Sequence, residues 1–199
     1  MSASSVWQLL DRPAIFHAAR FLLVGSQQLT KRLLREQLAA GSNETVLDVC
    51  CGVGEFAEAV AGRYVGVDLN ERFIHGARRR YRGDARKRFE VADVLQSHYP
   101  TGHFDKAMLV NSLHHFSDEE ATRLMTELRR ITRRLIVVVD ADGTPRGAIR
   151  RLLLALDRGH FMRTPARLAE VVGRVLPVAQ TVTFDVGLYG EVLLRCPLV

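Results

Sequence analysis

Short apolar runs rich in valine alternate with amphipathic helical stretches from residue 45 onward, and this alternation constrains the fold more than any other feature of the chain. Strands that are buried on both faces of a parallel sheet are almost wholly apolar, and the runs have that character. The pattern predicts an α/β fold in which helices cover a parallel sheet. Strands are expected at 45–49, 64–67, 88–91, 106–110 and 135–139, with helices at 55–61, 70–81 and 118–131.

The N-terminal part of the chain is expected to be helical. Apolar residues recur at three- and four-residue steps over residues 6–39, and Pro13 and Gly25 are expected to divide this segment. We predict that residues 1–40 form a helical lid over a single domain that comprises residues 41–199.

The C-terminal part completes the predicted sheet. A basic amphipathic helix is expected at 146–157, and Thr164 followed by Pro165 has the pattern of an N-cap for a helix that runs to Val172. Two last strands, at 179–186 and 190–196, predict an antiparallel hairpin. The predicted architecture is a Rossmann-like, doubly wound, seven-stranded sheet that is mostly parallel and ends in this hairpin.

Composition supports one buried core. The chain has 199 residues, of which 47% are hydrophobic, so neither disulfides nor a metal are needed to stabilise it. Its three cysteines are too few for a disulfide framework, which favours a reducing, cytoplasmic setting. No apolar run reaches the ~18 residues of a membrane span, and the N-terminus lacks the layout of a secretory signal. Cys50 and Cys51 are interpreted as small core residues, since no other cysteine or histidine is spaced to complete a zinc site.

A glycine-bearing turn follows the first predicted strand directly and precedes a predicted helix. Gly52 and Gly54 adopt backbone angles that other residues avoid, and they let a ligand approach the main chain closely. Many nucleotide-binding folds have such a loop, so the loop alone is a weak signal. No Gly-Lys-Ser/Thr follows it, and phosphate binding in the P-loop manner is therefore not expected.

Acidic residues end three successive predicted strands. Asp48 ends the first, Asp68 ends the second in a position suited to ribose hydroxyls, and Asp93 ends the third, where it could accept a hydrogen bond from the amine of adenine. Leu69 and Val94, which follow two of these acids, belong to the same predicted site. The pattern indicates one ligand with an amino acid, a ribose and an adenine. The alternative is that each acid only makes local hydrogen bonds, and for Asp48 it is a serious one.

These segments resemble the cofactor site of class I S-adenosylmethionine-dependent methyltransferases over residues 44–140. The sequence Val-Cys-Cys-Gly at 49–52 is similar to the variant in the ubiquinone and menaquinone methyltransferases. The resemblance implies that S-adenosyl-L-methionine is the cofactor. It also implies that Asp48 and the glycine loop surround the methionine part, that Asp68 holds the ribose, and that Asp93 holds the adenine.

The same resemblance extends to the fourth strand and includes departures from the family pattern. A backbone carbonyl near Asn111 is implied to face the methionine ammonium. Family members usually have glycine in place of Cys50, so the loop is expected to be wider here or the thiol to pack behind it. The residues after Asn111 differ from the quinone enzymes' motif. A nicotinamide dehydrogenase usually has a third glycine near Ala57, and that interpretation leaves Asp93 unexplained.

Methyl transfer mainly requires that the acceptor is held in line with the methyl group, and a base is needed only if the acceptor loses a proton. His114 and His115 follow the fourth strand and are candidates for that base. The alternative is that one imidazole packs against the cofactor while the other caps the next helix. A second polar group, which is a candidate for substrate contacts, consists of Asp157, Arg158 and His160, although a solvated helix end is the favoured interpretation.

The predicted lid carries aromatic residues, which either belong to the core or line an acceptor pocket: Phe16, His17 and Phe21. If they line a pocket, the acceptor is a small, mostly apolar or aromatic metabolite, and the reaction is an O- or C-methylation. The net charge of +6 and the arginine clusters raise the alternative of an RNA methyltransferase, although these arginines fall on expected solvent faces. A third reading is a non-catalytic, cofactor-binding subunit.

Overall fold

The computed structural model describes residues 27–144, 147–156 and 159–198. The strands are β1 (Thr45–Val49), β2 (Arg63–Asp68), β3 (Lys87–Val91), β4 (Phe104–Val110), β5 (Thr132–Ala141), β6 (Gln180–Val186) and β7 (Tyr189–Pro197). The α-helices are α3 (Gln28–Leu38), α4 (Glu71–Arg80), α5 (Asp118–Ile131), α6 (Gly147–Leu156) and α7 (Pro165–Gly173). Short 3₁₀ helices follow three strands: η1 (Ala57–Ala59), η2 (Val94–Gln96) and η3 (Leu113–His115).

The strands form one seven-stranded sheet in the order β3-β2-β1-β4-β5-β7-β6. The first five strands are parallel, and β7 pairs antiparallel with both β5 and β6. The predicted doubly wound sheet with an antiparallel C-terminal hairpin is confirmed. The strand order reverses between β1 and β4, and ligands of open α/β sheets bind at the carboxyl edge beside such a reversal.

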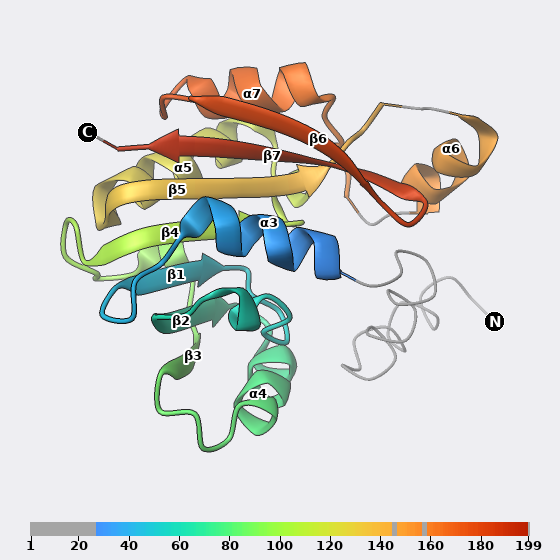
Figure 1. The fold of residues 1–199 in the computed structure, drawn as a ribbon. Coiled ribbons are helices and arrows are strands. Elements are labelled where there is room, and N and C mark those ends of the chain that lie inside the picture. Colours follow the sequence, from blue (N-terminus) through green and yellow to red (C-terminus); the bar gives the residue numbers. More distant parts are fainter. Residues whose placement is uncertain (1–26, 145–146, 157–158, 199) are drawn as a thin grey trace.

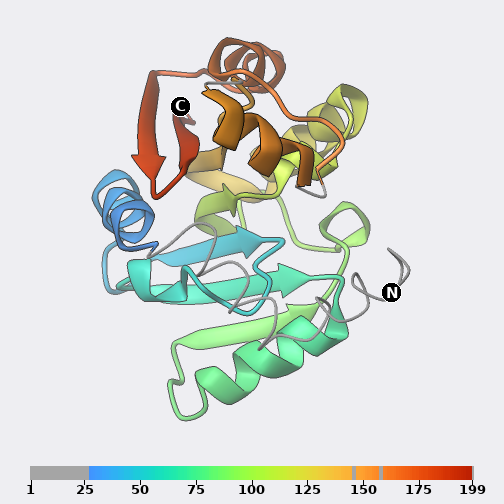
Figure 2. The ribbon, with the colours of Figure 1, turned by 90° about the vertical axis from the view of Figure 1, so that its right-hand side faces the viewer.

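Helices cover both faces of the sheet and bury two apolar clusters (Figure 1). On one face, α5 and α7 bury Leu124, Leu128 and Leu168 against the strands. On the other face, α3 and α4 bury Leu34 and Ile74. Figure 2 shows α3 and α5 on opposite sides of the sheet. Because both faces are covered, the central strands are apolar on both sides, which explains their runs in the sequence, whereas the edge strands β3 and β6 expose much of their length.

The prediction of a helix at 55–61 is wrong. The segment instead forms the single 3₁₀ turn η1 after a series of turns, with i to i+3 hydrogen bonds from Ala59 to Phe56 and from Val60 to Ala57. The Lys87 ammonium donates to the carbonyls of Ala57 and Val60 at 2.9 and 2.5 Å. The Ala57 carbonyl thus accepts from both this ammonium and the Val60 N–H. The ammonium satisfies the Val60 carbonyl at the end of the turn, and too few residues separate the loop from β2 for a longer helix.

Three helices begin at residues that cap them. Ser117 and Glu120 form a capping box at the start of α5. The Asn70 side chain accepts from the first turn of α4, and the Thr164 hydroxyl accepts from Arg167 at the start of α7. The predicted N-cap at Thr164 is thereby confirmed. Each cap gives an acceptor to N–H groups of the first turn that have no partner within the helix.

The predicted lid lies mostly outside the described residues. Of residues 1–40, the structure describes α3 and its flanks, and Leu34 and Leu38 of this helix pack into the core. The remainder of the lid, residues 1–26, is outside the described part, so the lid stays a prediction. Across the described ranges, none of the helices has both the length and the apolar character needed to cross a membrane.

Candidate functional site

The glycine loop after β1 has a left-handed backbone at alternate residues. Cys50, Gly52 and Gly54 have φ angles of 57°, 54° and 72°. Cys50 therefore adopts a conformation that favours glycine, which explains the glycine that the resembling family has there. A Cβ added to Gly52 would meet no atom within 4 Å, whereas one on Gly54 would lie 2.8 Å from the Phe89 ring. Gly52 thus leaves its main chain open to approach, and Gly54 permits tight packing beneath.

Neither cysteine of the loop has the character of a nucleophile. Burial raises the pKa of the Cys50 thiol to about 12, with the charges of Asp68 and Asp48 acting in the same direction. Burial also raises the pKa of Cys51. Both thiols are free of disulfides, as is that of Cys196, and they stay protonated at neutral pH. The interpretation of these residues as small packing residues agrees with this geometry.

Asp68, at the end of β2, holds the glycine loop in place. Its carboxylate accepts from the Gly52 N–H and from the Asn70 N–H, both at 2.8 Å. The next residue, Leu69, is a large apolar side chain that is 71% exposed. The edge therefore presents carboxylate oxygens, an open stretch of main chain and an exposed apolar side chain next to one another.

Asp48 lies beneath the loop rather than on its surface. It is 1% exposed, and its carboxyl accepts from the Tyr64 hydroxyl of β2 at 2.6 Å. Burial raises the pKa of Asp48 to about 7; the Tyr64 hydrogen bond opposes this shift and the charge of Asp68 adds to it. Burial likewise raises the pKa of Tyr64 well above its usual value. The structure thus shows Asp48 in a local hydrogen bond, which was the alternative to a direct role in cofactor binding.

Asp93 caps the 3₁₀ helix after β3. Its carboxylate accepts from the Leu95 N–H and from the Gln96 side chain, both at 2.9 Å. The carboxylate is partly exposed at the same sheet edge as Asp68, while the neighbouring Val94 side chain is buried in the core. Because a carboxylate has about four acceptor positions, these two hydrogen bonds leave capacity for a ligand.

Asn111, directly after β4, also has a left-handed backbone, with φ 50°. Its N–H donates to the Val139 carbonyl at 2.8 Å, and its side-chain amide donates to Glu191 at 2.9 Å. The second oxygen of Glu191 accepts from the Thr30 hydroxyl of α3 at 2.7 Å. Glu191 is 3% exposed, and the sequence reasoning missed it. This carboxylate joins the end of β4 to α3.

The two candidate histidines have different surroundings. His114 is 5% exposed, and its Nδ1 is hydrogen-bonded to Oδ1 of Asp140 in β5, which is 2% exposed. His115 is exposed, and the two ring centroids are 4.3 Å apart. Asp140 is a second residue that the sequence reasoning missed. A carboxylate that accepts from Nδ1 fixes the orientation of an imidazole and favours its protonated form.

A buried arginine holds the segment that carries His114. Arg163 is 5% exposed, and its guanidinium donates to the carbonyls of Leu113 and Phe116 at 3.1 and 2.7 Å and to Asp118 at 2.8 Å. In the same segment, the Phe161 N–H donates to the His114 carbonyl at 3.0 Å. Arg163, a third missed residue, therefore ties η3 to the chain before α7.

The remaining predicted residues are mostly outside the part of the chain that the structure describes, and their roles stay predictions. Phe16, His17, Phe21, Asp157 and Arg158 lie outside the described residues. His160 is described and exposed.

The arginine clusters largely pair with neighbouring groups, as expected of solvent faces. Arg80 contacts Glu55 and Glu58, and Arg134 contacts Glu44.

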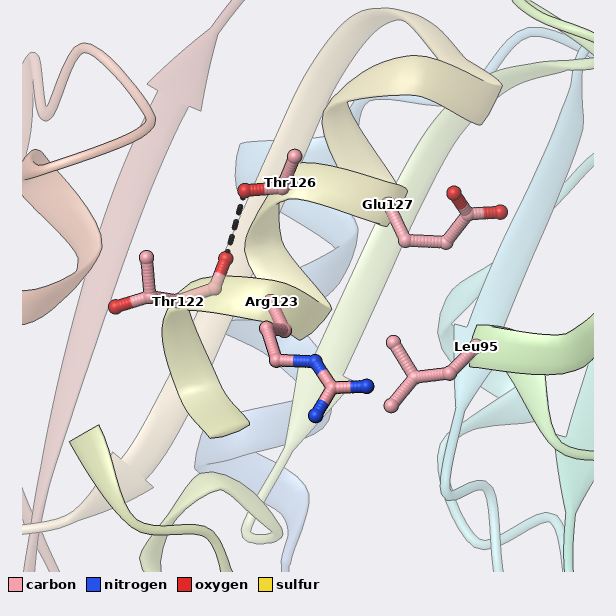
Figure 3. Close-up of a pocket in the computed structure, with 5 residues that line it drawn as sticks. All are labelled: Leu95, Thr122, Arg123, Thr126 and Glu127. Carbon is pink, nitrogen blue, oxygen red and sulfur yellow. Dashed lines mark hydrogen bonds between the residues drawn. The ribbon is translucent and has the colours of Figure 1, made fainter. Parts of the chain in front are cut away.

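A hollow of about 320 Å³ lies between η2 and α5, and Leu95, two residues after Asp93, lines it (Figure 3). The Thr126 hydroxyl beside it donates to the Thr122 carbonyl, as Figure 3 shows, and Glu127 binds Arg130. The hollow shares no residue with the predicted cofactor site. It is lined by Leu95, Thr122, Arg123, Thr126 and Glu127.

Comparisons with known proteins agree with this geometry. Residues 46–134 match the family model of the methyltransferase domain. Methyltransferase GfsG of Streptomyces halstedii is 27% identical over 156 residues, which are 75% of this chain and 55% of that protein. The 27-O-demethylrifamycin SV methyltransferase of Amycolatopsis mediterranei is 34% identical over 98 residues, which are 46% of this chain and 36% of that protein. The chain thus spans about half or less of the length of these relatives.

A solved structure with the same fold covers the whole chain. Magnesium protoporphyrin IX methyltransferase from Synechocystis PCC 6803, crystallised with bound SAH, has a TM-score of 0.74 and 18% identity, and the match covers 100% of both chains. At this identity the likeness shows a common fold. The narrower resemblance to the quinone methyltransferases stays a prediction.

Proposed function

We propose that this chain, which has the class I methyltransferase fold and whose residues 46–134 belong to the methyltransferase domain family, is an S-adenosylmethionine-dependent methyltransferase acting on a small apolar or aromatic metabolite. One observation carries the proposal. The Gly52 N–H donates to Asp68 at the carboxyl edge of the sheet, so the open glycine loop and the candidate ribose acceptor form a single unit.

The residues at the edge fit this cofactor. Asp68 offers carboxylate oxygens to ribose hydroxyls, and the exposed Leu69 side chain offers an apolar surface to adenine. The space above Gly52, where an added Cβ would meet no atom, suits the close passage of a ligand along the main chain. Asp93 would hold the adenine amine and Asn111 the amino-acid end.

When bound, the cofactor supplies a methyl group that is already electrophilic because it is attached to a sulfonium. We propose that His114 acts as the base when the acceptor is a hydroxyl. With Nδ1 directed to Asp140, Nε2 is the atom that would take the hydroxyl proton. The electron pair left on the acceptor oxygen would form the new O–C bond, while the S–C bond would break with its electron pair going to sulfur. Asp140 is then a positioning residue, because it orients the imidazole and stabilises its positive charge.

The relatives support a small-molecule acceptor. The curated relative from Amycolatopsis is named for a rifamycin, and the Synechocystis structure is of an enzyme named for a porphyrin. O-methylation or C-methylation of a small molecule is the proposed reaction class.

The experiment is methyl transfer from cofactor labelled in its methyl group, with cell extract separated into small molecules and RNA as acceptors. We expect label in the small-molecule fraction, and loss of that label with the His114→Ala variant. Label in the RNA fraction would instead favour the RNA methyltransferase alternative. Binding of the cofactor without transfer to either fraction would favour the non-catalytic alternative.

A further inference from the structure

We infer that Glu191 is a positioning residue for the amino-acid end of the cofactor and that it acts through Asn111, an inference that rests on the proposed function. Glu191 lies in β7, paired with Ala141 at the end of β5. Because β7 runs antiparallel to β5, its first residues reach the carboxyl edge at which the parallel strands end. A residue from near the C-terminus is thereby placed beside the loop after β4.

The contacts of Glu191 define a bridge between two elements. Its Oε1 accepts from the Asn111 amide at 2.9 Å, and its Oε2 accepts from the Thr30 hydroxyl at 2.7 Å. Both hydrogen bonds have a buried carboxylate as acceptor, since Glu191 is 3% exposed. Hydrogen bonds to charged groups are stronger than those between neutral groups, so the bridge constrains both partners.

Asn111 is the partner whose conformation matters for a ligand. It has φ 50°, a value that non-glycine residues seldom adopt, and it stands where β4 ends beside β1, at the reversal of strand order. Its N–H is fixed by the Val139 carbonyl at 2.8 Å, and its side chain is fixed by Glu191. With its N–H and its side chain both held, Asn111 has a fixed orientation at the carboxyl edge of the sheet.

Two ligands separate this role from a general structural one. S-adenosylhomocysteine has the amino-acid end, whereas 5′-methylthioadenosine has the same adenosine and thioether without it. Titration calorimetry of the full chain with both ligands gives an affinity ratio that reports on the amino-acid end alone. We expect Glu191→Ala to weaken S-adenosylhomocysteine about 10- to 100-fold, the range of one charge-assisted hydrogen bond, and to leave 5′-methylthioadenosine unchanged.

Further variants identify the route through Asn111. Glu191→Gln keeps an acceptor oxygen for the Asn111 amide and is expected to restore most of the affinity ratio. Asn111→Ala is expected to lower the ratio as Glu191→Ala does, and it tests the inference even if Glu191→Ala fails to fold. Thr30→Val removes only the hydrogen bond to α3 and is expected to leave the ratio at its wild-type value.

The inference is overturned if Glu191→Ala weakens both ligands equally, which is the result of a purely structural role, or if it weakens neither. It is also overturned if Asn111→Ala leaves the ratio unchanged. A different result marks failure of the proposed function itself: the folded wild-type chain then binds neither ligand, and the inference fails with it.

Discussion

His114 and Asp140 form a buried hydrogen bond between Nδ1 and Oδ1 that joins the turn after β4 to the end of β5. Asp140 Oδ1 also accepts from the Ala141 N–H at 3.0 Å, so a main-chain hydrogen bond helps to hold the carboxylate that contacts the imidazole. A pair of this kind at the edge of an α/β sheet matches the arrangement that a general base needs, because the base must be oriented before the acceptor arrives.

Replacement of His114 by alanine is expected to lower the rate of O-methylation by about 10²- to 10⁴-fold, the range that general-base catalysis contributes. Single-turnover rates with saturating cofactor measure this loss. His103→Ala is the matched control, since His103 is exposed and precedes β4 at the opposite edge of the sheet. A His114→Ala variant with the wild-type rate would show that the acceptor is methylated without this base.

Arg163→Lys is expected to cost about 3 kcal/mol of unfolding free energy. Lysine cannot reproduce the planar set of donors that reaches Leu113, Phe116 and Asp118, and it would leave buried carbonyls without partners. The control is Arg167→Lys, because Arg167 also binds Asp118 but at the surface, where such a pair contributes little to stability. Urea unfolding of both variants measures the difference, and equal losses would disprove the special role of Arg163.

Cys50 should tolerate glycine better than a branched side chain. Its φ of 57° suits glycine, so Cys50→Gly is expected to stay within about 1 kcal/mol of the wild-type stability, whereas Cys50→Val is expected to lose about 2 kcal/mol or more. Cys196 is buried in β7 and provides the reverse case, because its replacement by glycine leaves a gap in a regular strand. Thermal unfolding tests the order of the variants. If Cys50→Val were as stable as Cys50→Gly, the left-handed conformation would be wrong.

Asp48 gives the stability a specific dependence on pH. Burial raises its pKa from 3.8 in the unfolded chain to about 7 in the folded chain, so between these values the folded state holds a proton that the unfolded state has lost. This contribution to stability is present at low pH and is lost as the pH rises to about 7, by about 1.4 kcal/mol for each unit between the two pKa values.

The Asp48→Asn variant tests this dependence, because its amide keeps an acceptor for Tyr64 but does not titrate. Urea unfolding at pH 5 and at pH 7.5 should show the variant gaining stability relative to the wild type at the higher pH. Parallel pH profiles for the two proteins would contradict the assignment.

The central strands were predictable because their own residues are mostly apolar, as burial on both faces requires. Runs such as Leu135–Val139 are apolar on both faces, and this signal needs no knowledge of the partner strands. The prediction of a helix at 55–61 was wrong because the local apolar pattern does not show a distant contact. The ammonium of Lys87, 30 residues after Ala57, donates a hydrogen bond to the Ala57 carbonyl. Local patterns do not contain that contact.

The site was predictable where its residues end strands, and it was missed where distant segments meet. Asp68 follows an apolar run and Asp93 follows the edge strand β3; Asp140 follows an apolar run like that before Asp68, so that pattern could have identified it. Glu191 and Arg163 carry no such signal. Their partners Asn111 and Leu113 are 80 and 50 residues away, and the contacts depend on the order of the strands.

The central claim is that Asp68 and the glycine loop together hold the adenosyl part of the cofactor, and calorimetric titration with S-adenosylhomocysteine tests it most directly. The wild-type chain is expected to bind at one site, and Asp68→Ala to bind at least about tenfold more weakly, because it loses a charged acceptor and the hydrogen bond from Gly52. Asp84→Ala is the matched control, as Asp84 also accepts from a loop N–H, that of Arg86, but lies before β3 at the opposite edge. Wild-type affinity in the Asp68→Ala variant would contradict the account.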